Sequence, residues 1–205
     1  MKIKNIALVG NPNCGKTSLF NTLTGTRQKV ANYAGVTVER KEGSFKLPSG
    51  DAVRVLDLPG TYSLKPSSLD EEVTRAVCLG ELKGEILPDI FICVVDATNL
   101  SLHLSLVLEV RALNRPMILV LNMMDEVKKR GISIDKDKLS QLLGIPVVEA
   151  VAVKTKGIQD LIKIFISKKI TYPEPRQYAE SYESALDART QFRHSLDRLP
   201  QAHRA

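Results

Sequence analysis

The 205-residue sequence has few of the residues that build several common kinds of functional site. It contains three cysteines and three histidines, and none of them forms a Cys-x-x-Cys pair or a ligand-spaced cluster. Neither a disulfide framework nor a metal centre built from cysteine and histidine is therefore predicted, and a reducing cytoplasm fits. Aromatic residues make up only 5% of the chain. Nucleic-acid binding is disfavoured, because it calls for a basic stripe with interleaved aromatic side chains.

The sequence also lacks long apolar runs. The longest candidates, Ile90–Val95 and Met117–Leu121, are strand-sized and fall short of the ~18–20 residues that cross a bilayer. The first residues are not apolar enough for a signal peptide. We therefore expect a soluble chain that is not exported by that route. Its net charge of +6 comes from basic residues spread along the chain, which is compatible with a place near an anionic membrane surface.

What the sequence does have is an alternation of strand and helix patterns, and 43% of its residues are hydrophobic. This pattern predicts an α/β domain with a mostly parallel, six-stranded sheet between two helical layers, with about five helices. Residues 26–39 show no periodicity and are predicted to be a loop. Strands are expected at Ile3–Val9, Lys41–Leu47, Ala52–Asp57, Ile90–Val95, Met117–Leu121 and Ile145–Ala150, with helices at Lys16–Thr24, Asp70–Leu82, Leu100–Leu108 and Ile158–Ile166.

The first strand is followed directly by Gly10–Thr17, which fits the pattern G-x-x-x-x-G-K-[ST]. In such a P-loop the backbone N–H groups and the start of the next helix surround phosphate oxygens. Lys16 would neutralise the β- and γ-phosphates, and the Thr17 hydroxyl would bind Mg²⁺. Cys14 is interpreted as a small residue of this turn; the alternative is a reactive thiol whose pKa the electropositive surroundings lower.

Three further motifs follow later strands. Asp57–Gly60 offers a carboxylate for Mg²⁺ and a Gly60 N–H for the γ-phosphate. In Asn122–Asp125 the Asp125 carboxylate would accept hydrogen bonds from guanine N1–H and its amino group, a pair of donors that adenine lacks. Asn122 would brace the loop and touch the base; a simple helix start is the alternative reading. After the last strand, the backbone of residues 151–153 would offer an N–H to guanine O6.

Together these elements resemble P-loop GTPases of the translation-factor-like class over residues 3–168. The loop at residues 28–40, with its string N-x-x-G-V-T-V-E, resembles the bacterial ferrous iron transport protein B family in particular. By this resemblance Thr37 is the switch I threonine that binds Mg²⁺ and the γ-phosphate. The alternative is a β-branched residue that starts a strand.

Three positions carry hypotheses about activity and affinity. Thr61 stands where many GTPases have a water-orienting Gln, which predicts slow hydrolysis. Asn13 occupies a position that holds K⁺ in potassium-activated GTPases, although it would equally serve to stabilise the loop. Met123 replaces the usual Lys of N-K-x-D, which predicts nucleotide affinity nearer micromolar than picomolar.

These assignments give one candidate site with Mg²⁺ and, by resemblance, K⁺ as cofactors. The catalytic candidates are Asn13, Lys16, Thr37 and Gly60. Thr17, Thr37 and Asp57 are the candidate Mg²⁺ ligands, and Asn13 is the candidate K⁺ ligand. The nucleotide-binding candidates are Gly10, Asn11, Pro12, Asn13, Cys14, Gly15, Lys16, Thr17, Ser18, Gly35, Val36, Thr37, Asp57, Gly60, Asn122, Met123, Asp125, Val151, Ala152 and Val153.

The resemblance also implies a wider setting. Residues 1–170 would form a GTP-binding domain, and residues 171–205 a linker and an incomplete helical extension. Family members continue into a membrane permease, so we expect a piece of a longer protein that acts on the cytoplasmic face of the bacterial inner membrane. GTP and GDP are the expected ligands, and a homo-oligomer remains open. A soluble GTPase of ribosome assembly or tRNA modification, and a nucleotide-binding module without catalysis, are the alternatives.

Overall fold

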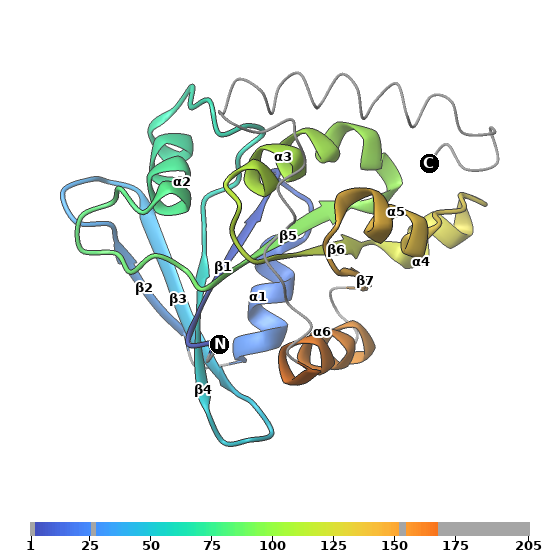
Figure 1. The fold of residues 1–205 in the computed structure, drawn as a ribbon. Coiled ribbons are helices and arrows are strands. Elements are labelled where there is room, and N and C mark those ends of the chain that lie inside the picture. Colours follow the sequence, from blue (N-terminus) through green and yellow to red (C-terminus); the bar gives the residue numbers. More distant parts are fainter. Residues whose placement is uncertain (1–2, 26–27, 152–154, 168–205) are drawn as a thin grey trace.

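The computed structural model describes residues 3–25, 28–151 and 155–167 (Figure 1). Seven strands form one sheet in the order β2-β3-β4-β1-β5-β6-β7. The strands are β1 (Asn5–Gly10), β2 (Gln28–Asn32), β3 (Glu39–Lys46), β4 (Ala52–Asp57), β5 (Ile90–Asp96), β6 (Met117–Asn122) and β7 (Val147–Glu149). The helices are α1 (Lys16–Thr24), α2 (Leu69–Leu79), α3 (Leu100–Ala112), α4 (Met124–Lys129), α5 (Lys136–Leu143) and α6 (Thr155–Ser167), with a 3₁₀ turn at Ala97–Asn99.

The predicted α/β class and mostly parallel sheet are confirmed, with one strand more than expected. Strands β4, β1, β5, β6 and β7 are parallel, whereas β3 runs antiparallel to β4, and β2 antiparallel to β3. The extra strand, β2, falls in the segment predicted to be a loop. All of its side chains are exposed. It is held by backbone pairing with β3 and buries no face, so its sequence carries no alternation to detect.

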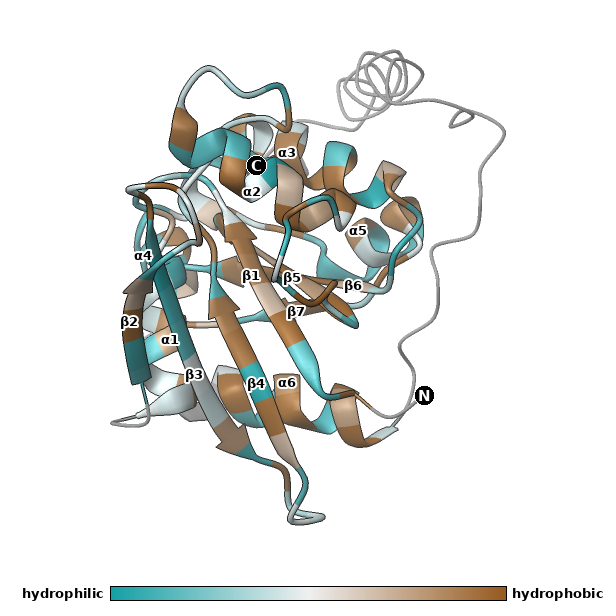
Figure 2. Cartoon of the chain, turned by 90° about the vertical axis from the view of Figure 1, so that its left-hand side faces the viewer, coloured by the Kyte–Doolittle hydropathy of each residue, from teal (hydrophilic) through white to brown (hydrophobic). Residues whose placement is uncertain are grey.

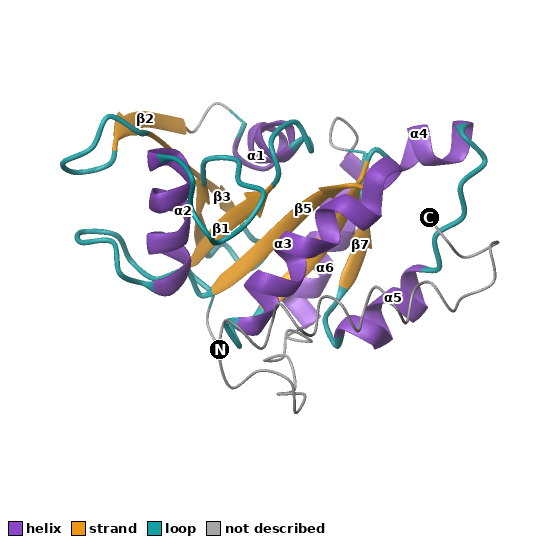
Figure 3. Cartoon of the chain, turned by 90° about the horizontal axis from the view of Figure 1, so that it is seen from above, coloured by secondary structure: helices purple, strands orange, loops and turns teal. Residues whose placement is uncertain are grey.

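Two apolar clusters cover the two faces of the sheet. Alternate residues of β5 separate between them: Phe91, Cys93 and Val95 join one cluster, and Ile90, Ile92 and Val94 the other. Helices α2, α3, α4 and α5 contribute to the first cluster, and α1 and α6 to the second (Figure 1). The central strands β1 and β4 are accordingly brown in Figure 2, whereas β3 is largely teal or pale. Seen from above, α2 lies towards the β3 side and α3 lies over β5 (Figure 3).

Two short helices, α4 and α5, are absent from the sequence-based expectation. Each buries only two apolar side chains, Met124 and Val127 in α4 and Leu139 and Leu143 in α5. A helical face that repeats only once gives no clear period. Within the described residues, no helix is both long and apolar enough to cross a membrane. The linker and helix expected at 171–205 lie outside the described residues.

Candidate nucleotide-binding site

The P-loop joins the end of β1 to the start of α1, and its backbone shape depends on glycine. A Cβ on Gly10 would come within 2.4 Å of the carbonyl oxygen of Val94 on the neighbouring strand. Gly15, which caps α1, has a φ of 86°, in the left-handed region that favours glycine. Asn13 also has a positive φ of 62°, which asparagine tolerates better than most residues. The turn thus presents the N-terminus of α1, where anions are stabilised, at the carboxyl edge of the sheet.

Lys16, Thr17 and Asp57 meet at this edge. Lys16 Nζ forms an ion pair with Asp57 Oδ1, and both side chains are buried. Thr17 Oγ1 donates a hydrogen bond of 2.9 Å to Asp57 Oδ2. The parallel pairing of β1 with β4, which sets Leu8 opposite Asp57, explains why residues so far apart in sequence converge. Hydroxyl and carboxylate oxygens side by side are donors of the kind that Mg²⁺ prefers.

The loop that follows β6 supports the P-loop from the other side. Asn122 Nδ2 donates a hydrogen bond of 2.9 Å to the carbonyl oxygen of Cys14. Met123 has a φ of 60° and is the N-cap of α4, and Asp125 lies exposed in the first turn of that helix.

The segment after β7 lies beside this loop. The Ala150 N–H donates to the carbonyl oxygen of Leu121 at 2.7 Å, and the Met124 N–H donates to the carbonyl oxygen of Ala150 at 3.4 Å. Val151, the next residue, is half-buried. Two of the predicted contacts to the base, Ala152 and Val153, lie outside the described residues.

Two cavities share Lys16, Thr17 and Gly60 in their walls. The larger has a volume of about 510 Å³ and the smaller about 270 Å³. The larger is lined by Asn11, Pro12, Asn13, Gly15, Lys16, Thr17, Ser18, Gly60 and Met123. The smaller is lined by Lys16, Thr17, Val38, Glu39, Lys41, Asp57, Leu58, Pro59, Gly60 and Asp70. The P-loop and Gly60 thus lie between two neighbouring cavities, the larger of which also reaches Met123 of the loop after β6.

Switch I (residues 28–40) makes a tight turn around Gly35. The Tyr33 N–H donates to the carbonyl oxygen of Val38 at 3.0 Å, and the Val36 N–H donates to the carbonyl oxygen of Tyr33 at 3.2 Å. Gly35 has a φ of 80°. The side chain of Thr37 is exposed, and its neighbours Val38 and Glu39 line the smaller cavity. Thr37 is therefore next to the site but not part of the cavity wall.

Switch II (residues 57–69) packs against the P-loop at Gly60. A Cβ on Gly60 would stand 3.1 Å from backbone atoms of Pro12. The Thr61 N–H donates to the carbonyl oxygen of Gly10 at 3.1 Å, and Thr61 is fully buried. The Thr61 hydroxyl lies 2.6 Å from the carbonyl oxygen of Ser63 and 3.1 Å from a carboxylate oxygen of Glu71. Its hydroxyl is therefore engaged with the protein.

The surroundings of Cys14 support the interpretation as a small residue and not the alternative of a reactive thiol. The side chain is buried, and this burial raises the pKa of its thiol to about 11, outweighing the opposite effect of Lys16. The sequence correctly placed Cys14 beside a lysine but did not reveal that the thiol points into the protein. Cys14 is thus a small residue of the P-loop with a buried side chain. Its backbone carbonyl oxygen accepts the hydrogen bond from Asn122.

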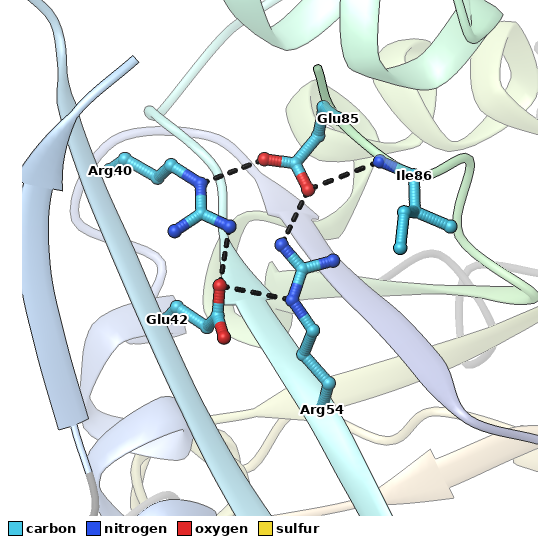
Figure 4. A network of polar contacts seen from close by, with 5 residues as sticks. All are labelled: Arg40, Glu42, Arg54, Glu85 and Ile86. Carbon is cyan, nitrogen blue, oxygen red and sulfur yellow. Dashed lines mark hydrogen bonds and ion pairs between the residues drawn. The ribbon is translucent and has the colours of Figure 1, made fainter. Parts of the chain in front are cut away.

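Two polar features near the site were not found from the sequence. The first is an ion-pair network that joins β3 and β4 to the loop after α2 (Figure 4). Arg40 Nε and Arg54 bind the two carboxylate oxygens of Glu85 at 2.8 and 2.5 Å. Glu42 pairs with both arginines. Opposite charges along the predicted hairpin were a signal for three members, whereas nothing in the sequence pointed to Glu85.

The second feature is Glu109, a buried acidic residue on α3 that contacts switch II. It lies on the face of the helix that enters the apolar core. A charged residue on an apolar helical face is the sequence signal that marks this position.

Comparison with known proteins identifies the family. A model of the family described as ferrous iron transport protein B matches residues 4–165. The Fe(2+) transporter FeoB of Escherichia coli K12 is 48% identical over 165 residues, which are 78% of this chain and 21% of that protein. A fusion of Fe(2+) transport protein A with FeoB from Porphyromonas gingivalis is 42% identical over 192 residues, 91% of this chain and 22% of that protein. The chain thus spans about a fifth of the length of these relatives.

Solved structures that resemble this chain come from the same family as the sequence relatives. The G domain of the T. maritima FeoB iron transporter is 44% identical, covers 81% of this chain and 98% of its own, and has a TM-score of 0.72. The cytosolic domain of the same transporter in its GMPPNP form is 40% identical, covers 98% of this chain and 77% of its own, and has a TM-score of 0.78. Since the family match also includes every described strand of the sheet, this chain belongs to the ferrous iron transport protein B family.

Proposed function

We propose that this chain binds GTP, hydrolyses it slowly to GDP and phosphate, and acts as the nucleotide-dependent switch of a ferrous iron transporter. The observation that carries the proposal is the convergence of Lys16, Thr17 and Asp57 beside the cavity at the carboxyl edge of the sheet. Relatives with the same fold are described in GMPPNP and GDP forms. A hollow lined by backbone N–H groups, a lysine and a helix N-terminus suits the phosphates of a nucleotide.

The phosphates would lie along the P-loop. Lys16 would leave Asp57 to contact the β- and γ-phosphates, and Thr17, Asp57 and Thr37 would hold Mg²⁺ on the same side. When bound, this ion supplies positive charge that offsets the charge of the phosphate oxygens. Gly60 would offer its N–H to the γ-phosphate. The two switches would relax when that phosphate leaves, because their contacts with it end.

Guanine would bind between the loop after β6 and the segment after β7. Asp125 would accept hydrogen bonds from guanine N1–H and its amino group. Asn122 would hold the loop against the P-loop, as its bond to Cys14 indicates. The backbone of residues 151–153 would contact guanine O6. A site built to bind these polar groups rejects a base that lacks them, because its own groups are then left unpaired.

Slow hydrolysis follows from the surroundings of Thr61. Its hydroxyl already contacts Ser63 and Glu71, so it is not available to orient an attacking water. Asn13 is exposed at the rim of the larger cavity and has its side chain available. We infer that it helps to hold K⁺ near the phosphates, where a cation stabilises the charge of the transition state.

The wider assignment rests on the family. We propose that residues 1–170 form the GTP-binding domain and residues 171–205 a linker and helical extension. A membrane permease domain that lies elsewhere in the full-length protein would be the partner in iron transport. The nucleotide domain would then work at the cytoplasmic face of the bacterial inner membrane.

The experiment is the release of phosphate from GTP and from ATP, each measured in potassium and in sodium buffer with Mg²⁺. We expect slow turnover of GTP only, and faster turnover in potassium. Asp125→Asn should abolish turnover of GTP at micromolar concentrations, and Asn13→Ala should remove the potassium effect alone. Glu126→Gln, on the same short helix as Asp125, is the matched control and should change neither. Equal turnover of GTP and ATP would refute the guanine site.

A further inference from the structure

A buried carboxylate on α3 binds the downstream part of switch II. Glu109 is only 1% exposed. Its two carboxylate oxygens accept hydrogen bonds from the Ser63 hydroxyl at 2.9 and 3.1 Å, and one of them also accepts the Leu64 N–H at 2.5 Å. The side chain of Leu64 is buried in the apolar cluster that α3 helps to form. Switch II is thus fastened here by both polar and apolar contacts.

The hydrogen bonds of the Glu109 carboxylate come from switch II. In the described part of the chain its hydrogen-bond donors are Ser63 and Leu64, and it forms no ion pair with a lysine or arginine. Burying a carboxylate is unfavourable unless hydrogen bonds satisfy its oxygens, and an apolar residue of similar size often serves a core equally well. A position needed only for packing would therefore not require an acid.

A short chain of contacts links Glu109 to Gly60. Ser63, which Glu109 binds through its hydroxyl, accepts a hydrogen bond of 2.6 Å from Thr61 through its carbonyl oxygen. Thr61 is the residue after Gly60, and its N–H is bonded to Gly10 of the P-loop at 3.1 Å. Gly60 itself lines both cavities of the site. The position of the Gly60 N–H therefore depends on a segment that Glu109 fixes.

We propose that Glu109 is a positioning residue for GTP hydrolysis, which anchors Ser63–Leu64 to α3 so that Gly60 is held at the γ-phosphate. This inference rests on the proposed function. GDP has no γ-phosphate for the Gly60 N–H to contact, so the anchor would act on turnover and not on GDP binding. Glutamine at this position keeps an oxygen that accepts from both donors, whereas leucine keeps only the packing.

The kinetic test compares Glu109→Leu, Glu109→Gln and Ser63→Ala with the unmodified chain. Loss of hydrogen bonds to a charged acceptor predicts that Glu109→Leu lowers kcat for GTP about tenfold or more, with the Kd for GDP within about threefold. Glu109→Gln should restore most of the rate, and Ser63→Ala should lower it less than Glu109→Leu. Phe45→Leu, in the cluster on the other face of the sheet, is the control for a general loss of stability.

Hydrogen exchange tests the anchor without any turnover. In nucleotide-free protein the Leu64 amide should exchange faster in Glu109→Leu than in the unmodified chain, and amides of the central strands should not change. A folded Glu109→Leu variant with unchanged kcat, or with GDP affinity reduced in proportion to kcat, would overturn the proposal. If that variant does not fold, unchanged kcat in Ser63→Ala overturns it. If the unmodified chain turns over no GTP, the proposed function fails, whereas the exchange result still decides whether the anchor exists.

Discussion

At the scale of single residues, all three cysteine side chains are buried. Burial raises the pKa of Cys14 to about 11 and of Cys78 to about 12, and it also raises that of Cys93. At pH 8 a thiol of pKa 11 is ionised to only about one part in a thousand, and the thiolate is the reactive form. We predict that the folded chain reacts very slowly with a soluble maleimide and that all three cysteines react in denaturant.

Mass spectrometry of the labelled peptides measures this. The informative peptide is the one that contains Cys14, since it is the only cysteine next to a lysine of the site. Rapid labelling of Cys14 in folded protein would contradict its placement beneath the P-loop.

Met123 is the residue that sets this site apart from GTPases with N-K-x-D. It lines the larger cavity with P-loop residues and adopts a φ of 60°. A lysine here would add an ammonium group beside the P-loop while its carbon chain would keep the apolar contact proposed for methionine. We predict that Met123→Lys tightens GDP binding about tenfold, or about 1.4 kcal/mol, measured by titration calorimetry. Met123→Leu is the control and should leave the affinity unchanged. Weaker binding by the lysine variant would contradict the proposed position of the nucleotide.

At the scale of elements, the network of Figure 4 fastens β3, which follows switch I, to the loop after α2. Burial raises the pKa values of Glu42 and Glu85, but the hydrogen bonds and charges of Arg40 and Arg54 outweigh it and hold both pKa values below the ordinary range. Because the folded pKa is the lower one, this stabilisation is present above the unfolded pKa of about 4.5 and is lost as the pH falls through the folded values.

We therefore predict that Glu85→Gln lowers the free energy of unfolding by about 1.5–3 kcal/mol at pH 7, because Arg40 and Arg54 then share the single carboxylate of Glu42. The difference should shrink at pH 3, which is below the unfolded pKa of about 4.5, because the lowered pKa of Glu85 in the folded chain then contributes less to stability. Urea denaturation at both pH values measures it. Glu81→Gln, which removes an exposed partner of Arg75 at 3.1 Å, is the control and should cost under about 1 kcal/mol. An equal loss at both pH values would mean that packing, not charge, stabilises this network.

Whether the sequence predicts an element depends on how many apolar side chains that element buries. The P-loop was predicted from its motif. The strands around it were predicted from their apolar runs, because both faces of this sheet are buried. Strand β2 was missed because it exposes every side chain, and α4 because a six-residue helix shows hardly one period. Glu85 could not be placed, since its partners on β3 and β4 are brought to it by tertiary structure alone.

At the scale of the whole molecule, the topology explains why one end of the sheet is functional. The carboxyl ends of β1, β4 and β6 carry Gly10, Asp57 and Asn122, and parallel pairing through β5 brings these ends to one edge. Sequence motifs identified these residues and their place at strand ends, where ligands bind in sheets of this kind, whereas the strand order comes from the folded chain. The short contacts between the motifs, such as Asn122 to the carbonyl oxygen of Cys14, require the folded chain.

Because one ligand would touch the P-loop, switch II and the loop after β6 at once, its binding should stabilise the whole domain. A ligand present at about a thousand times its Kd adds about 4 kcal/mol. For a chain of this length each kcal/mol raises Tm by about 2–4 °C. We predict that millimolar GDP with Mg²⁺ raises Tm by about 8–16 °C in a thermal scan, that ATP raises it little, and that Asp125→Asn abolishes the effect of GDP. Thr17→Ala should remove only the part of the shift that depends on Mg²⁺, because Thr17 is a candidate ligand of that ion and not of the base. Equal stabilisation by GDP and ATP would show that the chain recognises phosphates without reading the base.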